Sequence, residues 1–282
     1  MNRLSDIGTI KSILSRHGFT FSKSLGQNFL INPSVCPRMA ELSGAKKGVG
    51  VIEVGPGIGV LTNELCKLAD KVVAIELDKR LLPVLDETLS EYDNLKVINA
   101  DVLKIDLNKL IEDEFSGMNV VVCANLPYYI TSPVIMKLLE DKLPVSAITV
   151  MVQKEAAQRI CAEVGSRQSG AVTVSVNYYA KPEMLFTVSS GSFMPAPKVD
   201  SAVIRLNILT EPPVKVCDEK KFFSVVKAAF SQRRKVISNS ISSGLSVNKA
   251  KASEILEKSG VLPTARAEQL TLQNFADIAN NL

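Results

Sequence analysis

Histidine is nearly absent from this chain of 282 residues, in which His17 is the only one. A histidine-rich metal site and a chain of histidine proton relays are therefore excluded, and at most one histidine-based catalytic triad can exist. Cysteine is sparse too, and no Cys-x-x-Cys spacing occurs among Cys36, Cys66, Cys123, Cys161 and Cys217. An odd number of widely spaced cysteines predicts neither a zinc ribbon nor a disulfide framework. We therefore expect no metal site, and free thiols in a reducing compartment.

Long hydrophobic runs are missing as well. No segment approaches the roughly 20 apolar residues that span a bilayer. Asp6 interrupts the start of the chain, and no apolar run with a small-residue cleavage pattern follows it. Hydrophobic residues still make up 46% of the chain, enough for a substantial core. We expect a soluble, cytoplasmic protein with no membrane partner, and a monomer, since no exposed apolar repeat indicates a partner subunit.

An excess of basic residues is confined to the two ends. Residues 1–28 have a net charge of +3 and residues 181–282 of +5, whereas residues 29–180 have −4. This distribution suits a polyanion that the flanks bind while a separate pocket holds another ligand, although charge also varies along ordinary soluble chains. The densest basic cluster, Arg233-Arg234-Lys235, is the strongest candidate for phosphate contacts, with a solvated helix face as the alternative.

Short apolar segments alternate with helical stretches from about residue 49 onward. Strands are predicted over 49–54, 71–77, 95–99, 120–124 and 147–152, with helices over 60–68, 80–89 and 133–139. Fully apolar strands separated by helices indicate a parallel sheet covered on both faces. The segments 171–180 and 201–209 are β-rich with no convincing helix between them, which predicts an antiparallel hairpin at the edge of this sheet.

The chain is expected to divide near residue 210. Glu211-Pro212-Pro213 interrupts the alternation, and helices are predicted beyond it over 220–231, 236–242, 248–258 and 272–280. The predicted architecture is a Rossmann-like α/β domain over residues 1–210, with a helical N-terminal arm in residues 1–30, and a small all-helical domain over residues 211–282.

A glycine-rich turn follows the first strand of the sheet, in Glu53-Val-Gly55-Pro56-Gly57-Ile-Gly59. The dinucleotide fingerprint is Gly-x-Gly-x-x-Gly, with backbone N–H groups directed at a pyrophosphate. Here the spacing is Gly-x-Gly-x-Gly, and Pro56 removes one backbone donor. A ligand without phosphates tolerates that loss better than NAD does, so a nicotinamide dehydrogenase is disfavoured.

Acidic residues follow at the ends of the next two strands. Glu76, nineteen positions after Gly57, can accept hydrogen bonds from both hydroxyls of a ribose, and Asp101 can accept from the amino group of adenine. A single acid at such a place can simply cap a helix. A glycine turn, a glutamate and an aspartate at three successive strand ends instead predict an adenosine ligand without pyrophosphate, which indicates S-adenosylmethionine.

The fourth strand continues into Asn125-Leu126-Pro127-Tyr128-Tyr129. The amino nitrogen of adenine is a poor nucleophile because its lone pair is delocalised into the ring. The Asn125 side-chain carbonyl and a backbone carbonyl held by the Leu126-Pro127 kink can accept hydrogen bonds from its two N–H groups and favour a pyramidal nitrogen. The Tyr128 ring offers a stacking face worth roughly 1–3 kcal/mol. This pattern predicts N6-methylation of adenine, with a strand-end cap and a proline turn as the alternative.

Further motifs extend the pattern, in Gly26-Gln27-Asn28-Phe29-Leu30, Phe193-Met-Pro195-Ala-Pro197-Lys-Val199-Asp-Ser201 and Phe230-Ser-Gln232-Arg-Arg234-Lys. In this combination the chain resembles, over nearly its full length, the KsgA/RsmA family of small-subunit (16S) rRNA adenine N6,N6-dimethyltransferases. The resemblance implies that Asn28 and Leu30 close over the methionine part of S-adenosylmethionine and that Phe193 packs the flipped adenine opposite Tyr128. It also assigns the rest of the cofactor to Gly55, Glu76, Asp101 and Asn125.

The resemblance further implies a substrate and a partner. The family dimethylates two adjacent adenosines in a hairpin loop near the 3′ end of small-subunit rRNA, within an immature 30S particle, and has a role in subunit biogenesis. Unpaired loop bases cost least to extrude into such a pocket. Two positions depart from the family pattern: Tyr129 stands where asparagine is common, and Ser169 where tyrosine commonly precedes the glycine. Both departures concern the substrate loops rather than methyl transfer.

Two other functions remain open at this stage. An Erm-type enzyme uses the same chemistry on a large-subunit rRNA adenine, but the Gly26–Leu30 segment and the long helical C-terminal region favour the small-subunit enzyme. A non-catalytic RNA-binding assembly factor could keep the fold without the activity. The intact Asn125–Tyr128 motif argues against it, because RNA binding alone needs no acceptors for an amino group.

Overall fold

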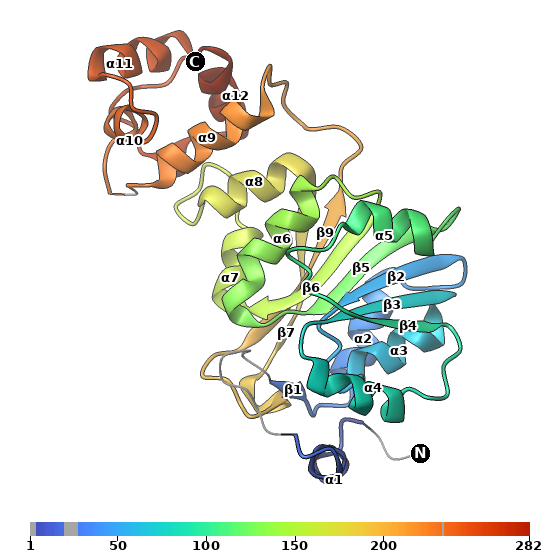
Figure 1. Cartoon of the computed structure of the whole chain (residues 1–282). Coiled ribbons are helices and arrows are strands. Elements are labelled where there is room, and N and C mark those ends of the chain that lie inside the picture. The colour runs from blue at the N-terminus through green and yellow to red at the C-terminus, as the bar shows by residue number, and fades with distance from the viewer. Residues whose placement is uncertain (1–3, 20–27, 233) are drawn as a thin grey trace. The chain divides into compact units, whose positions relative to one another are not determined.

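Seven strands form the main sheet of the computed structural model, which describes residues 4–19, 28–232 and 234–282 (Figure 1). In spatial order they are β4 (Leu95–Asn99), β3 (Lys71–Glu76), β2 (Val49–Val54), β5 (Asn119–Asn125), β6 (Ala147–Gln153), β9 (Ser201–Ile208) and β7 (Ala180–Val188). The first five pair in parallel, and β9 is antiparallel to β6. The expected parallel sheet with an antiparallel edge is confirmed.

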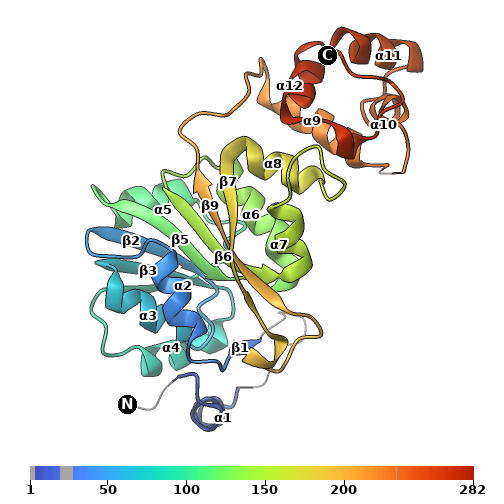
Figure 2. The same cartoon turned by 180° about the vertical axis from the view of Figure 1, so that it is seen from behind.

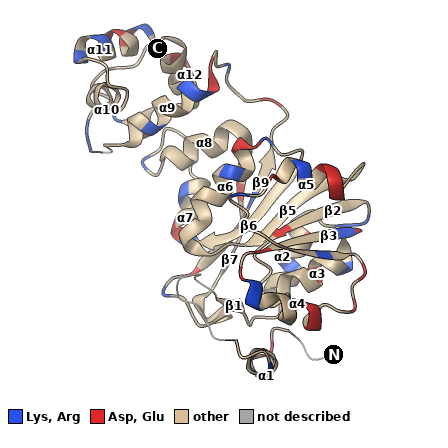
Figure 3. Ribbon diagram, in the orientation of Figure 1, with Lys and Arg blue, Asp and Glu red and all other residues tan. Residues whose placement is uncertain are grey.

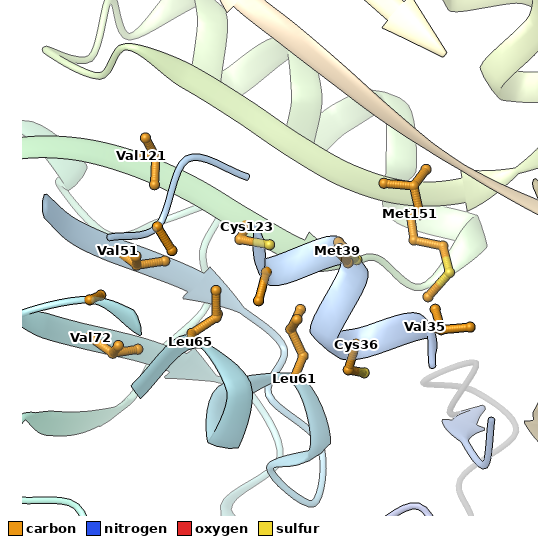
Figure 4. Packing of buried hydrophobic residues seen from close by; sticks show 14 of the residues in the cluster. Val35, Cys36, Met39, Val51, Leu61, Leu65, Val72, Val121, Cys123 and Met151 are labelled. Carbon is orange, nitrogen blue, oxygen red and sulfur yellow. The ribbon is translucent and has the colours of Figure 1, made fainter. Parts of the chain in front are cut away.

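Helices cover both faces of the parallel strands. The helices α2 (Val35–Leu42) and α3 (Val60–Leu68) lie on one face, and α5 (Leu107–Glu114) and α6 (Thr131–Glu140) on the other (Figures 1 and 2). Every residue of β2 is buried, as expected for a central parallel strand. Val51 and Val121 of the sheet pack with Leu65 of α3 and Met39 of α2 in one apolar cluster (Figure 4).

A two-stranded sheet lies beside the main one. It pairs β1 (Phe29–Leu30) with β8 (Phe193–Met194), two segments more than 160 residues apart in the sequence. The N-terminal helix α1 (Ile7–Arg16) begins at Asp6, whose carboxylate accepts a hydrogen bond from the backbone N–H of Thr9. Its apolar residues share a core cluster with Phe29 and Ile58, so α1 packs next to the glycine-rich turn. The segment between β3 and β4 holds η2 (Lys79–Leu81) and α4 (Leu82–Thr88).

The remaining helices build a separate core. They are α8 (Ala171–Tyr179), α9 (Glu219–Phe230), α10 (Ile237–Gly244), α11 (Lys249–Lys258) and α12 (Leu272–Asn280), while α7 (Lys154–Ile160) follows β6. The predicted strand over 171–180 is wrong, because 171–179 form α8. Its β-branched and aromatic residues favour a strand in isolation, but Val174 and Tyr178 are buried in one cluster with Phe222, so tertiary packing overrides local propensity.

The chain divides into two compact units. The first holds residues 1–157 and 183–208, and the second holds residues 158–182 and 209–282. The chain passes from the first unit to the second for the last time between residues 208 and 209, near the boundary predicted at residue 210. Residues 158–182, which were expected in the first domain, belong to the second unit. Separate roles for the domains 1–210 and 211–282 stay a prediction. Within the described residues, no helix is long and apolar enough to cross a membrane.

Candidate active site

One cavity in the first unit gathers nine residues expected at a functional site. It lies at the carboxyl ends of β2, β3, β4 and β5, the edge where α/β sheets bind ligands. The nine residues are Asn28, Leu30, Gly55, Glu76, Asp101, Asn125, Leu126, Tyr128 and Phe193. The structure thus places these nine residues around one cavity, and the role of each residue stays a prediction.

The glycine-rich turn after β2 forms the floor of this cavity. Gly55, Gly57 and Gly59 all have positive φ angles, of 70°, 61° and 89°, which L-residues with a side chain rarely adopt. A Cβ atom on Gly59 would also lie 2.9 Å from Leu89 Cδ1. The turn therefore needs glycine for its conformation, and Gly59 also for its contact with Leu89 outside the cavity. Gly55 and Gly57 line the cavity, so a ligand can lie against their backbone.

Glu76 ends β3 with its carboxylate directed at the glycine turn. One oxygen accepts a hydrogen bond from the Gly57 backbone N–H at 3.3 Å, and the other accepts from the Asp78 N–H at 2.8 Å. The residue is only 6% exposed, and burial raises the pKa of its carboxyl group. Each oxygen keeps further acceptor capacity, so the carboxylate can bind a ribose diol while it braces the turn.

A second buried acid, Glu53, also lines the cavity, although the sequence analysis gave it no role. It is 1% exposed, and the Thr62 side chain lies beside its carboxyl group. Burial raises the pKa of Glu53 to about 8, and the nearby charge of Glu76 adds to the shift. A glutamate inside an apolar strand, directly before a glycine turn, is the sequence signal that could have identified it.

The Glu53 carboxyl group makes stability depend on pH. Its pKa is higher in the folded chain than in the unfolded chain, so its stabilising contribution is complete below about pH 4.5 and is lost as the pH rises through about 8. Glu53→Gln mimics the protonated acid. We expect its free energy of unfolding to equal that of wild type near pH 5 and to be higher by on the order of a few kcal/mol near pH 8.5. Urea unfolding without cofactor measures this, and parallel pH profiles of the two proteins would contradict it.

Asp101 follows β4 and is partly committed to its own turn. Its Oδ1 atom accepts from the Leu103 backbone N–H at 3.0 Å, and Lys104 Nζ lies 3.6 Å from Oδ2. The side chain is 28% exposed and lines the cavity beside buried Val102. An acceptor next to an apolar wall suits the amino edge and the face of an adenine ring.

The end of β5 and the loop that follows it hold the residues predicted to accept hydrogen bonds from the target base. Asn125 ends the strand, and the next residue, Leu126, is 1% exposed and donates its N–H to the Met151 carbonyl at 3.2 Å. Pro127 then leads into the turn η3 (Tyr128–Ile130). Tyr128 is half-buried and Tyr129 is 54% exposed. The backbone is therefore fixed at Leu126, while the Tyr128 ring and the Asn125 amide remain available to a ligand.

Phe193 lines the cavity from β8, the strand that pairs with β1. Its register partner in the ladder is Leu30, and the Ile31 N–H extends the ladder to the Ser192 carbonyl at 2.8 Å. The Asn32 amide also donates to Ser192 Oγ at 3.2 Å. Leu30 and Phe193, which the sequence analysis assigned to the cofactor and to the acceptor base, are thus neighbours on one small sheet.

The basic cluster lies in the second unit. Arg233 falls outside the described residues, and Arg234 and Lys235 are exposed in the turn between α9 and α10 (Figure 3). Ser169, the other departure from the family pattern, is fully buried in the same unit. Among the described residues, no three histidine, cysteine or acidic side chains lie close enough together to hold a metal ion.

Comparison with known proteins adds an independent line of evidence. The family model described as "Ribosomal RNA adenine dimethylase" matches residues 18–282. "Ribosomal RNA small subunit methyltransferase A" of Alkaliphilus oremlandii is 48% identical over 283 residues, which cover 100% of this chain and 99% of that protein. The protein of the same name from Shouchella clausii is also 48% identical and covers 100% of this chain and 97% of its own length.

Solved structures share the fold. A dimethyladenosine transferase from Plasmodium falciparum superimposes with a TM-score of 0.73 at 26% identity, covering 89% of this chain and 95% of that one. The 23S rRNA methyltransferase ErmE gives a TM-score of 0.67 at 27% identity and covers 90% of this chain and 99% of its own. The expected Rossmann-like methyltransferase sheet with a helical C-terminal region is therefore confirmed.

Proposed function

Because the chain belongs to the ribosomal RNA adenine dimethylase family, we propose that it dimethylates N6 of two adjacent adenosines in a hairpin loop near the 3′ end of small-subunit (16S) rRNA. The chain is a methyltransferase that uses S-adenosylmethionine as methyl donor. The gathering of Glu76, Asp101, Asn125 and Tyr128 around one cavity carries the proposal. The names of relatives 48% identical over the whole chain support the small subunit as substrate.

The residues that line the cavity also suit S-adenosylmethionine by their chemistry. The glycine turn permits close backbone approach, and the buried Glu76 carboxylate can accept hydrogen bonds from two ribose hydroxyls. Asp101 would hold the adenine amino group, and Asn28 and Leu30 would cover the methionine part. When bound there, S-adenosylmethionine supplies an electrophilic methyl group on a sulfonium sulfur.

Residues at the end of β5 and directly after it would activate the acceptor base. The Asn125 side-chain oxygen and the Leu126 carbonyl accept hydrogen bonds from the two N–H groups of the target amino group. This favours a pyramidal nitrogen whose lone pair points at the methyl group. The Tyr128 ring stacks on one face of the base, and buried Phe193 packs on the other. No strong general base is needed, because the methylated nitrogen is acidic and loses its proton readily to water.

The Erm-type alternative has weaker support. The ErmE structure shares the fold at 27% identity, whereas full-length relatives 48% identical to the chain are named for the small subunit. A non-catalytic assembly factor would have no use for a polar floor and two amino-group acceptors in one cavity. We therefore propose the small-subunit enzyme, acting on an immature 30S particle as a cytoplasmic monomer with a role in small-subunit biogenesis.

The exposed basic turn between α9 and α10 is proposed to bind rRNA phosphates. We expect Arg234→Glu with Lys235→Glu to weaken RNA binding and to lower the slope of log K against log salt by about one to two, because released counterions scale with neutralised phosphates. The matched control is Lys220→Glu with Lys221→Glu, two exposed residues in the first turn of α9. If the Arg234/Lys235 variant and wild type had equal affinity and equal slope, the cluster would be a solvated surface that does not contact RNA.

Position mapping tests the proposed substrate. Unmethylated small subunits are incubated with the protein and S-adenosylmethionine, and the rRNA is digested and analysed by mass spectrometry. N6,N6-dimethyladenosine at two adjacent positions of one loop is expected. Dimethylation at scattered positions, or a single methyl group on another base, would contradict the proposal.

A further inference from the structure

Tyr128 is held by a bond that its own loop does not supply. The turn η3 contains no buried residue and no side-chain cap, so local packing does not determine how the Tyr128 ring stands. The phenol oxygen, however, lies 2.7 Å from Ser201 Oγ, on a residue 73 positions further along the chain. This hydrogen bond ties the ring to the main sheet.

Ser201 is a rigid anchor for that bond. It is the first residue of β9, is fully buried, and lies opposite Gln153 in the ladder with β6. The preceding residue, Asp200, is fixed on both sides. Its carbonyl accepts from the Lys154 N–H at 3.0 Å, and its carboxylate accepts from the Ser190 N–H at 3.0 Å. The hydroxyl at position 201 therefore has little freedom to move.

Either hydroxyl of this pair can donate the hydrogen bond. Burial raises the pKa of Tyr128, the bond with Ser201 acts in the opposite direction, and the Asp200 charge adds to the rise. The phenol therefore stays protonated at neutral pH, and the bond between the two hydroxyls persists there. Ser201 itself does not line the cavity, so it acts on a ligand only through Tyr128.

We propose that Ser201 is a positioning residue for methyl transfer, which fixes the Tyr128 ring in the orientation in which the target adenine stacks. The inference rests on the proposed function, since it presumes that an adenine enters this cavity. A stacking ring that is free to rotate pays the cost of ordering at every encounter with the substrate. A pre-oriented ring avoids that cost, which is the usual contribution of residues that support a binding group.

The test compares variants in steady-state methylation of small subunits. Loss of one neutral hydrogen bond predicts a fall in kcat/KM for the small subunit of between about threefold and tenfold in Ser201→Ala. Tyr128→Phe removes the other hydroxyl and is expected to show the same loss. The double variant should be no worse than either single one, because both changes remove the same bond. Affinity for S-adenosylmethionine, measured by calorimetry, should stay within about twofold.

Controls separate positioning from stability. Thr149→Val removes a buried hydroxyl from the neighbouring strand β6, one with no hydrogen-bond partner among the described residues, and is expected to leave kcat/KM unchanged. Ser201→Thr keeps the Oγ atom and should restore most of the activity. If Ser201→Ala fails to fold, Tyr128→Phe, which leaves β9 intact, decides the question.

The outcomes distinguish the inference from the proposed function. If wild type does not methylate small subunits, the proposed function is wrong. If wild type methylates them and Tyr128→Phe and Ser201→Ala equal it in kcat/KM, only the role of Ser201 is wrong. Additive losses in the double variant, or an equal loss of S-adenosylmethionine affinity, would also overturn the positioning role.

Discussion

Asn125→Ala is expected to reduce methyl transfer by at least about a hundredfold while affinity for S-adenosylmethionine stays within several-fold. The reason is that the Asn125 oxygen is needed where the target nitrogen becomes pyramidal, and removal of one preorganised polar group of this kind costs about 10²–10³ in rate. Asn125 ends β5 and lines the cavity, whereas most of the proposed cofactor contacts come from other elements. Single-turnover transfer to small subunits and calorimetry with the cofactor measure the two effects separately.

The same strand supplies the control for this prediction. Asn119 is the first residue of β5, is exposed, and lies at the opposite end of the strand from the cavity. Asn119→Ala should therefore leave both transfer and cofactor affinity unchanged. Near-normal turnover in Asn125→Ala would remove Asn125 from the mechanism, and equal losses in both variants would indicate damage to the strand instead.

Glu76→Ala is expected to weaken S-adenosylmethionine binding by between about tenfold and a hundredfold. Hydrogen bonds to a charged group contribute about 1.5–3 kcal/mol, and in the variant the ribose hydroxyls would lose their bonds to this carboxylate. The variant also removes the acceptor of the Gly57 N–H, so the glycine turn loses a brace. Calorimetric titration with S-adenosylmethionine measures the change.

Glu76→Gln sharpens this test. The two carboxylate oxygens face two backbone donors, at Gly57 and Asp78, and an amide can offer an oxygen to only one of them. We therefore expect Glu76→Gln to lose affinity as well, despite its matching shape. Glu112→Ala, on the exposed side of α5, is the control and should bind normally. Unchanged affinity in both Glu76 variants would mean that the ribose is held elsewhere.

The site was predictable because its parts lie at the ends of parallel strands. The carboxyl ends of such strands meet at one edge of the sheet. Gly55, Glu76, Asp101 and Asn125 could therefore be brought together from the sequence alone. Their hydrogen bonds to backbone groups, such as that of Glu76 with the Gly57 N–H, depend on short-range turn geometry. The shifted pKa of Glu53 was not foreseen, because it depends on burial that only the folded chain reveals.

What escaped prediction depends on contacts between distant segments. The helix over 171–179 has a strand-like composition, and only its burial with Phe222 selects the helix. The pairing of Leu30 with Phe193 joins segments more than 160 residues apart, and no periodicity in the sequence indicates it. The bond of Tyr128 to Ser201 is of the same kind. Motifs gave the positions of both residues, while their contact required the register of β9.

The most direct test of the central claim is a methyl-transfer assay with labelled S-adenosylmethionine. Unmethylated small subunits and bare large-subunit rRNA are offered side by side, and the labelled nucleoside is identified. The account predicts N6,N6-dimethyladenosine in the small subunit alone. Label in the large-subunit RNA would indicate an Erm-type enzyme, and no label in either substrate, with cofactor still bound, would contradict the assignment of methyl transfer to this cavity.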